Sequence, residues 1–313
     1  MTQEEFQEIQ RLLHQRADLN ARLSLIPYEG TPEVKERGES RYLYMRKRIG
    51  GKVTSTYVGA YSDELHQLLL KNAAEARDLR KQIRRIDKAL AQHGYAPADL
   101  APRVALNLDF ARANMKASIY DQAILEGVAT SFPQTEEIIE NGKVNGMTAS
   151  DVQKILNLKH AWEFILDEDI LLCSTGFAIL SHIARLVNEG FFRDGGQVRG
   201  VPVTIGGTSY VPPLPQETAI IERIEALLAD NVPPIDVAIN LCLYCMKAQV
   251  FTDGNKRASI LLANHFLISH GEGLLVVPEA DVPRFKELLI AYYEERDEGK
   301  LAAFMKDRCW RRF

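Results

Sequence analysis

The feature that most restricts the fold is a long helical repeat between Ser62 and Gln92. Apolar or small residues recur there in alternating steps of three and four, with one polar residue, Asn72, among them. The positions are Leu69, Asn72, Ala76, Leu79, Ile83, Ile86 and Leu90. This spacing is typical of a coiled-coil seam, in which a lone asparagine sets the register. The seam can pair within the chain or between two chains, so it leaves a homo-oligomer open.

A second helical pattern runs from Glu4 to Leu25. Two β-rich runs, residues 41–48 and 52–58, then flank Gly50-Gly51. Such a pair predicts a β-hairpin, because glycine supplies the positive φ of a tight turn. Residues 1–95 are therefore expected to form an N-terminal segment in which two helices pack as a hairpin and carry a β-hairpin at its tip.

A cluster of basic residues lies at the tip of the expected β-hairpin: Arg46, Lys47, Arg48 and Lys52. Residues 1–100 hold 17 Lys and Arg against 14 Asp and Glu, whereas the whole chain has a net charge of −4. So weak a field does not predict nonspecific nucleic-acid binding by the whole molecule. The cluster is either a solvated strand end or a contact for an acidic partner or nucleic acid.

Composition excludes several classes of protein. The chain is 46% hydrophobic and 26% charged, and it holds no apolar run of the ~20 residues that a membrane span requires. Four cysteines do not make a disulfide scaffold in a chain this long. Cys242 and Cys245 form a CxxC without a second pair, so core thiols are favoured over a zinc site. A cytoplasmic protein without a membrane partner is expected.

A linker with two prolines, Gly94–Pro102, separates this segment from residues 103–313, where helical patterns dominate. Residues 193–213 differ, because β-branched residues alternate there with glycines, which predicts a small β-hairpin or flap. The expected fold class is mainly α: a helical core with a small β-hairpin flap, preceded by a coiled-coil-like helical hairpin that carries a β-hairpin.

The residues with the clearest chemistry lie in the loop Gln249–Arg257, which is followed by a helix that reaches Gly271. A glycine-bearing loop ahead of a helix presents backbone N–H groups and the positive end of the helix dipole, and both favour phosphate. Lys256 and Arg257 add positive charge, and Asp253 is the kind of oxygen ligand that Mg²⁺ shares with substrate phosphates. The loop predicts a cradle for a Mg-nucleotide; the alternative is a plain helix–loop–helix corner.

This loop resembles the HxFx[D/E]GN[G/K]R signature of the Fic/Doc (Fido-fold) family. The residues in register are Phe251, Asp253, Gly254, Asn255, Lys256 and Arg257. The flap is similar to the family's target-binding hairpin at Val203, Ile205, Gly206, Gly207 and Tyr210. Glu126-Gly127, in an expected helix near residues 118–130, resembles the end of the family's inhibitory motif. Tyr292-Tyr293 stands where the family often places aromatics near the adenine. The resemblance covers roughly residues 105–313.

The resemblance implies a helical domain that binds ATP with Mg²⁺ and transfers AMP to a hydroxyl group of another protein. Gly254, Asn255 and Arg257 would hold the phosphates, and Asp253 would order Mg²⁺. The flap would pair with a strand of the target, which is a form of β-strand addition.

Gln249 departs from the family pattern, because the family has its general base, a histidine, at this position. A carboxamide cannot accept the hydroxyl proton near pH 7, and loss of a positioned base costs ~10²–10⁴-fold in rate. Other histidines, His182, His265 and His270, are expected to be structural.

Further departures concern the residues around the loop. The second arginine of the extended motif is replaced by Ile260, and the Ser or Thr that opens the inhibitory motif by Gln122, so Glu126 is expected to lack its family partner. Lys256 in place of glycine is similar to Doc-type toxins, which act as protein kinases. We therefore expect nucleotide binding with weak or lost AMP transfer. The alternatives are a transferase with altered chemistry and an interaction or nucleic-acid module that uses the N-terminal hairpin.

Overall fold

The structure, a computed structural model, describes residues 2–141 and 146–313. The chain groups into two compact units: the first contains Met1–Ala96 and Glu140–Lys143, and the second Pro97–Ile139 and Val144–Phe313. Among the described residues, no helix is long and apolar enough to cross a membrane.

The first unit is built on two antiparallel helices, α1 (Gln3–Leu25) and α2 (Asp63–Gln92). Apolar and small residues of both helices are buried between them, which confirms the helical seam: Leu12, Leu13, Ala17 and Ala21 in α1, and Leu69, Ala73, Ala76 and Leu79 in α2. An ion pair between Arg16 and Asp87, at 3.3 Å, joins the two helices. The seam is thus buried within the chain, with Ala73 on the buried face beside a half-buried Asn72.

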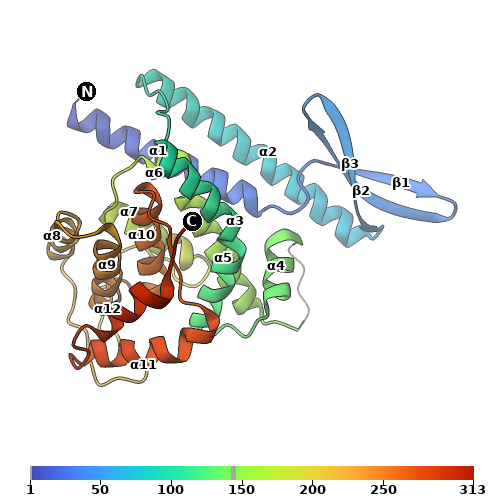
Figure 1. The fold of residues 1–313 in the computed structure, drawn as a ribbon. Coiled ribbons are helices and arrows are strands. Elements are labelled where there is room, and N and C mark those ends of the chain that lie inside the picture. Colours follow the sequence, from blue (N-terminus) through green and yellow to red (C-terminus); the bar gives the residue numbers. More distant parts are fainter. Residues whose placement is uncertain (1, 142–145) are drawn as a thin grey trace. The chain divides into compact units, whose positions relative to one another are not determined.

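A three-stranded antiparallel sheet connects these helices, in the order β1 (Thr31–Arg37), β2 (Ser40–Ile49) and β3 (Lys52–Ala60). Gly50 and Gly51 have φ of +54° and +82°, so the expected β2–β3 turn is confirmed. The strand β1, which contains Pro32, is not predicted from the sequence. A proline is tolerated in an edge strand such as β1. Figure 1 shows the strands next to α2.

The second unit is almost entirely helical, which confirms the expected fold class. Its helices are α3 (Pro102–Leu125), α4 (Phe132–Asn141), α5 (Ala149–Ile165), α6 (Glu168–Leu171), α7 (Phe177–Val187), α8 (Glu217–Leu228), α9 (Pro234–Ala248), α10 (Asn255–Ser269), α11 (Val282–Tyr293) and α12 (Lys300–Phe304). A 3₁₀ turn, Glu279–Asp281, precedes α11, and a π-helical turn, Met305–Cys309, follows α12.

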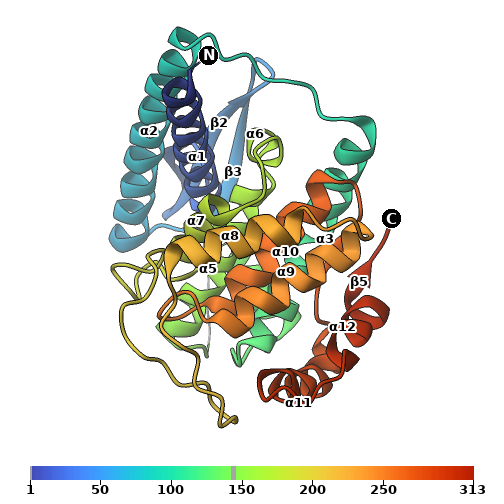
Figure 2. The same ribbon diagram turned by 90° about the vertical axis from the view of Figure 1, so that its left-hand side faces the viewer.

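Helix α10 forms the centre of this unit. It is buried along nearly its whole length and packs against α3, α5, α7 and α9. A helix with buried residues on every side must be surrounded by other elements, and Figure 2 shows α9 and α10 lying side by side. The loop between α9 and α10 therefore starts and ends on well-packed helices, which fixes its backbone.

The flap differs from its predicted form. Within the described residues 201–213 the structure has extended arms on either side of a turn at Gly206-Gly207, and no strand pairing. Pro202, Pro212 and Pro213 lack the N–H group that a strand ladder needs, which accounts for the difference. The strands of the second unit are instead β4 (Leu274–Leu275) and β5 (Trp310–Arg311), a short antiparallel pair.

Candidate functional site

The candidate site is the loop between α9 and α10, whose ends both have left-handed backbone. Gln249 ends α9 with φ +46° and ψ 58°, and Gly254 precedes α10 with φ +75°. A Cβ atom on Gly254 would lie 2.8 Å from Asn188 Oδ1 and 3.0 Å from a methyl group of Val187. Glycine at this position therefore satisfies both a backbone conformation and a close approach.

The side chain of Asn255 holds the loop in shape. Its Oδ1 accepts a hydrogen bond from the backbone N–H of Phe251 at 2.9 Å, and its Nδ2 donates to the Phe251 carbonyl at 2.7 Å. The same Nδ2 also donates to Gln249 Oε1 at 3.1 Å. The ring of Phe251 is buried. These contacts use Asn255 as a brace inside the loop, where the family resemblance implies a phosphate contact.

The carboxamide of Gln249 is held on both sides. Besides accepting from Asn255, it donates from Nε2 to the carbonyl of Met246 at 2.7 Å. A neutral amide in these two contacts has no lone pair with the basicity needed to remove a proton from a hydroxyl group. Gln249 borders the cavity described below, but as a polar wall rather than a base.

Arg257 is the buried cation of the site, with an exposed fraction of 2%. It donates from Nη1 to the Val187 carbonyl at 2.7 Å and from Nη2 to Asp253 Oδ2 at 2.9 Å. Glu126, which caps the C-terminus of α3, brings Oε2 to 3.5 Å from Arg257 Nε and Oε1 to 3.4 Å from Lys256 Nζ. The arginine that the family pairs with this glutamate is replaced by Ile260, but Glu126 still has two cations in ion-pair range, Lys256 and Arg257.

Two of these charged atoms make no hydrogen bond to any described residue. Glu126 Oε1 and Arg257 Nε are buried and accept or donate no hydrogen bond, although each lies in ion-pair range of an opposite charge. Buried polar atoms are normally satisfied, and an exception in a native structure calls for an explanation such as a ligand or water. The charges here are arranged loosely enough to exchange partners.

A cavity of about 450 Å³ opens over this loop. It is lined by residues of α3, the flap, the loop and α11: Glu126, Thr204, Ile205, Gly206, Gln249, Asp253, Gly254, Asn255, Lys256, Lys286, Leu289, Ile290 and Tyr293. The first turn of α10 lies at its floor, and no described side chain caps that helix start. Uncapped N–H groups at a helix start, the helix dipole and two lysines are features that favour an anion.

Arg199 was missed by the sequence analysis, and it links the flap to the loop. It is 3% exposed and donates from Nε to the Gln249 carbonyl at 2.6 Å. Its other nitrogens donate to the carbonyls of Val201 at 2.7 Å and Pro213 at 2.6 Å, at opposite ends of the flap. Burial lowers the pKa of Arg199 from its ordinary value. Nothing in the local sequence distinguishes this arginine from its exposed neighbour Arg193.

The flap is also held against the end of α11. Tyr210 stacks on Tyr293, with ring centroids 6.1 Å apart. Glu294 Oε1 accepts from Thr208 Oγ1 at 2.9 Å and from the Ser209 N–H at 3.2 Å. Hydrogen bonds from Arg296, Thr208 and Ser209 lower the pKa of Glu294 to about 2.

Only some of the residues predicted for the flap and for adenine binding line the cavity over the loop. Ile205 and Gly206 line the cavity, whereas Val203, Gly207 and Tyr210 are not among its lining residues. Gly207 takes a positive φ of +83° in the flap turn. The two neighbouring tyrosines separate: Tyr293 lines the cavity, and Tyr292 lines a different one.

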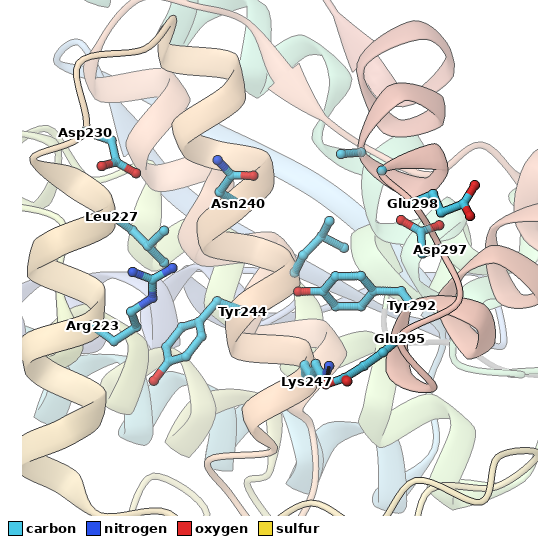
Figure 3. A pocket seen from close by; sticks show the side chains of 13 residues that line it. Arg223, Leu227, Asp230, Asn240, Tyr244, Lys247, Tyr292, Glu295, Asp297 and Glu298 are labelled. Carbon is cyan, nitrogen blue, oxygen red and sulfur yellow. Dashed lines mark hydrogen bonds and ion pairs between the residues drawn. The ribbon is translucent and has the colours of Figure 1, made fainter.

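That second cavity, of about 540 Å³, lies between α8, α9 and the segment that joins α11 to α12. Figure 3 shows Arg223 and Tyr244 on the α8–α9 side and Tyr292 facing α9 from the other. Lys247 Nζ lies 3.0 Å from Glu295 Oε1 and 5.5 Å from the centre of the Tyr292 ring. Lys247 and Glu295 are thus lining residues of this cavity that form an ion pair with each other.

The histidines of the unit occupy structural positions. His265 is buried, with Nδ1 2.8 Å from Thr175 Oγ1 and Nε2 2.9 Å from the Ile170 carbonyl. His182 stacks on Phe164 with ring centroids 4.1 Å apart, and His270 Nδ1 lies 2.7 Å from the Phe266 carbonyl. Among the described residues that line the loop cavity, none is a histidine.

A resident metal site built from protein ligands alone is not found in the part of the chain that the structure describes, where no three His, Cys, Asp or Glu residues gather to hold an ion. Asp253 supplies one carboxylate at the cavity, 52% exposed at its side chain and bound to Arg257 through Oδ2. This donor set fits a cation that a phosphate-bearing ligand brings with it, because Mg²⁺ is often held by one or two carboxylates plus substrate phosphates and water.

Comparison with protein families gives a match to each unit. Residues 177–267 match the Fic/DOC family, which spans α7 to α10 and includes the loop. Residues 2–67 match a domain of unknown function, DUF6788, which covers α1, the sheet and the start of α2.

Individual proteins agree with the first of these matches. The chain is 26% identical over 195 residues to "Protein adenylyltransferase Fic" of Drosophila mojavensis, a match that covers 60% of this chain and 38% of the relative. A Fic domain containing signaling protein from Bacteroides thetaiotaomicron has a similar fold, with a TM-score of 0.54 and 16% identity, over 66% of this chain and 85% of that one. A Fic family protein from Desulfovibrio desulfuricans has a TM-score of 0.52 and 15% identity, over 67% and 73% of the two chains. The chain spans well under half the length of the curated relatives it matches.

Proposed function

This protein contains a Fic/DOC family domain, and on that premise we propose that it binds the phosphates of a Mg-nucleotide at the α9–α10 loop, with AMP transfer to proteins weak or lost. The observation that carries the proposal is the start of α10. An uncapped helix N-terminus faces a cavity that also contains Lys256 and Lys286, with Arg257 buried beneath. Such an arrangement attracts phosphate through fixed dipoles and charges.

The size and lining of the cavity support a nucleotide. Its volume of about 450 Å³ lies within the range of ligand pockets, roughly 300–1,000 Å³. Its lining combines the two lysines with apolar and aromatic residues, Ile205, Leu289, Ile290 and Tyr293. A ligand with an anionic part and a flat, weakly polar part matches this mixed lining. Relatives named protein adenylyltransferase support ATP as the first nucleotide to test.

Asp253 would hold Mg²⁺ together with the phosphates, because its carboxylate reaches the cavity and Oδ1 is left over from the bond to Arg257. The ion would neutralise phosphate charge when bound. Arg257 then has two tasks. It anchors the loop to the Val187 carbonyl, and it orients Asp253.

AMP transfer by this site would be slow because the site lacks a group that removes the proton of the target hydroxyl. In AMP transfer the hydroxyl group of the target must lose a proton as its oxygen attacks the α-phosphorus, and Gln249 cannot take it. Positioning of the nucleotide still lowers the barrier. Slow transfer is therefore compatible with this site, and fast transfer requires a base from elsewhere. The carboxylate of Asp253 lines the cavity and could take that proton only where it does not hold Mg²⁺, so a transferase with altered chemistry is the second candidate function.

The flap would present a target to this cavity. Its arms form no strand ladder within the described residues. Pairing with a target strand would use the backbone groups of non-proline residues such as Val203 and Ile205. Arg199 and Glu294 keep the flap in place beside the loop.

Calorimetric titration with Mg-ATP tests the proposal. We expect micromolar binding to the full chain and a loss of at least tenfold in Lys256→Ala, because charge-assisted hydrogen bonds contribute about 1.5–3 kcal/mol. Lys154→Ala is the matched control. Lys154 is 31% exposed at its side chain and pairs with Asp151, much as Lys256 is 30% exposed and pairs with Glu126. Absence of binding at millimolar Mg-ATP would refute the proposal.

Intact-mass analysis of cell-extract proteins incubated with the chain and ATP separates the two candidates. A binding protein leaves no adduct above the level of a Lys256→Ala control. Adducts of AMP or of phosphate that disappear in Asp253→Asn would favour the transferase with altered chemistry.

A further inference from the structure

The sheet of the first unit has two faces of different chemistry. Leu43 and Met45 of β2 and Val58 of β3 are buried on one face, where they pack with Leu69 of α2. Because side chains alternate along a strand, Tyr42 and its neighbours at even positions of β2 point to the opposite face. We call this the tyrosine face and define it by Lys35, Tyr42, Tyr44, Arg46, Arg48 and Tyr57.

Three tyrosines gather at its centre. The ring centroid of Tyr57 lies 5.5 Å from that of Tyr44 and 6.2 Å from that of Tyr42. Tyr57 is 53% exposed, and Tyr42 and Tyr44 are half-buried. Aromatic rings that a sheet leaves partly exposed to water are typical of a binding surface.

Basic side chains surround these rings. Lys35 Nζ lies 4.5 Å from the centre of the Tyr44 ring, a cation–π contact. Arg46 and Arg48 continue the same face of β2 and are exposed. The one carboxylate in register with the tyrosines, Glu33, pairs with Lys35 at 3.6 Å. Residues 31–60 carry seven Lys and Arg against three Glu, so the sheet is positive.

The pleat divides the basic cluster of the sequence in two. Lys47 points away from the tyrosine face and pairs with Glu29, which also pairs with Arg80 of α2. The charge of Lys47 is thus neutralised by an ion pair within the unit. Arg46 and Arg48 stay on the face with the tyrosines, where they are exposed to a ligand.

We propose that the tyrosine face binds single-stranded nucleic acid, with bases stacked on the tyrosines and phosphates on Arg46 and Arg48. Stacking surfaces lined by cations are the means by which proteins hold single strands without a sequence code. An acidic peptide would pair with the arginines but would leave the exposed rings without flat partners. This function goes beyond the nucleotide cavity and uses other residues.

Fluorescence anisotropy of the full chain with labelled strands tests the inference. The probes are a 20-nucleotide DNA of mixed sequence, the RNA of the same sequence, and the DNA as a duplex. We expect both single strands to bind more tightly than the duplex at low salt. The ratio of DNA to RNA affinity then tells which of the two single strands the face prefers.

Two variants locate the binding. Arg46→Gln with Arg48→Gln should reduce the slope of log affinity against log salt by about 1.4, since each phosphate contact with a single strand contributes ~0.7. Tyr57→Ala should weaken binding roughly fivefold or more, the effect of losing one stacked base. The matched control, Arg84→Gln with Arg85→Gln, removes two exposed charges from α2 and should leave both quantities unchanged.

Four results would overturn the inference: no anisotropy change with any strand, tighter binding of the duplex, an equal loss in the α2 control, or displacement of the strands by polyglutamate as readily as by unlabelled DNA. The last would identify the face as a contact for an acidic protein. Circular dichroism of each variant must match that of the parent chain, and Tyr57→Phe, which keeps the ring, should bind like the parent.

Discussion

Glu126 Oε2 lies 3.5 Å from Arg257 Nε, close enough for attraction but without a hydrogen bond, and Glu126 lines the cavity over the α9–α10 loop. In the proposed function, a bound phosphate would compete with this carboxylate for the same cations. We predict that Glu126→Gln raises the affinity for Mg-ATP roughly tenfold, about 1.4 kcal/mol, because an anion that competes for Lys256 and Arg257 is removed. Calorimetry compares it with Glu136→Gln, a carboxylate paired with Lys116 elsewhere in the unit. Unchanged affinity would make Glu126 a structural cap of α3.

Gln249→His should restore AMP transfer if the remaining site is competent. Histidine tolerates the left-handed backbone found at this position, φ +46°, better than most residues. A positioned base is worth ~10²–10⁴-fold in rate, so adducts that are barely visible with the parent chain should become abundant. Mass spectrometry of labelled extract proteins measures this gain. Gln249→Asn, which has no base, should show none.

Arg199→Met should loosen the flap and lower stability. The change leaves the carbonyls of Gln249, Val201 and Pro213 without their donor. These hydrogen bonds are only partly buried, so water can replace part of the lost donor, and we expect a loss of about 1–3 kcal/mol and a fall in Tm of several degrees. Arg193→Met, at an exposed neighbouring arginine, is the control. Proteolysis should cut Arg199→Met within residues 201–213, and resistance equal to that of the control would contradict the assigned role.

Gly254→Ala should destabilise the loop. The added Cβ would meet Asn188 Oδ1 at 2.8 Å in a backbone conformation that disfavours side chains. A loss of about 2 kcal/mol is expected from the two effects together. Gly200→Ala, where a Cβ would meet nothing within 4 Å, should be nearly neutral. Urea unfolding compares the two, and equal midpoints would show that the loop can relax around the methyl group.

The attachment of the flap to Glu294 should depend on pH. Its pKa falls from the ordinary value of 4.5 to about 2 in the folded chain, because the ionised form accepts hydrogen bonds from Arg296, Thr208 and Ser209. A lowered pKa means that the contact is fully present above pH 4.5 and is lost as the pH falls toward 2. The protection of the Ser209 amide and its neighbours against hydrogen exchange, relative to the intrinsic rate at each pH, should therefore fall over this range. In Glu294→Gln this protection should be low already at pH 7, with little further change in acid.

Local pattern was sufficient for the helices, for the β2–β3 hairpin and for the loop between α9 and α10. The spacing of apolar residues in α2 reflects the helix period, and Gly50-Gly51 reflects the backbone of a tight turn. Both are properties of neighbouring residues. The strand β1 was not predicted because it contains Pro32, which disfavours a strand unless that strand lies at a sheet edge, and edge position is set by tertiary pairing. The flap has no strands because prolines in its arms remove the donors of a ladder.

The sequence by itself therefore determined the features that depend on neighbouring residues. These are the mainly helical elements, their order, and a glycine-bearing loop of the kind that favours phosphate. The tertiary structure decided which charges meet. It brought Glu126, 131 residues before Arg257, beside that arginine and Lys256. It buried Arg199 under the flap, and it turned Lys47 away from Arg46 and Arg48. Such pairings depend on how distant elements pack and on the pleat of a sheet, and no spacing along the chain encodes them.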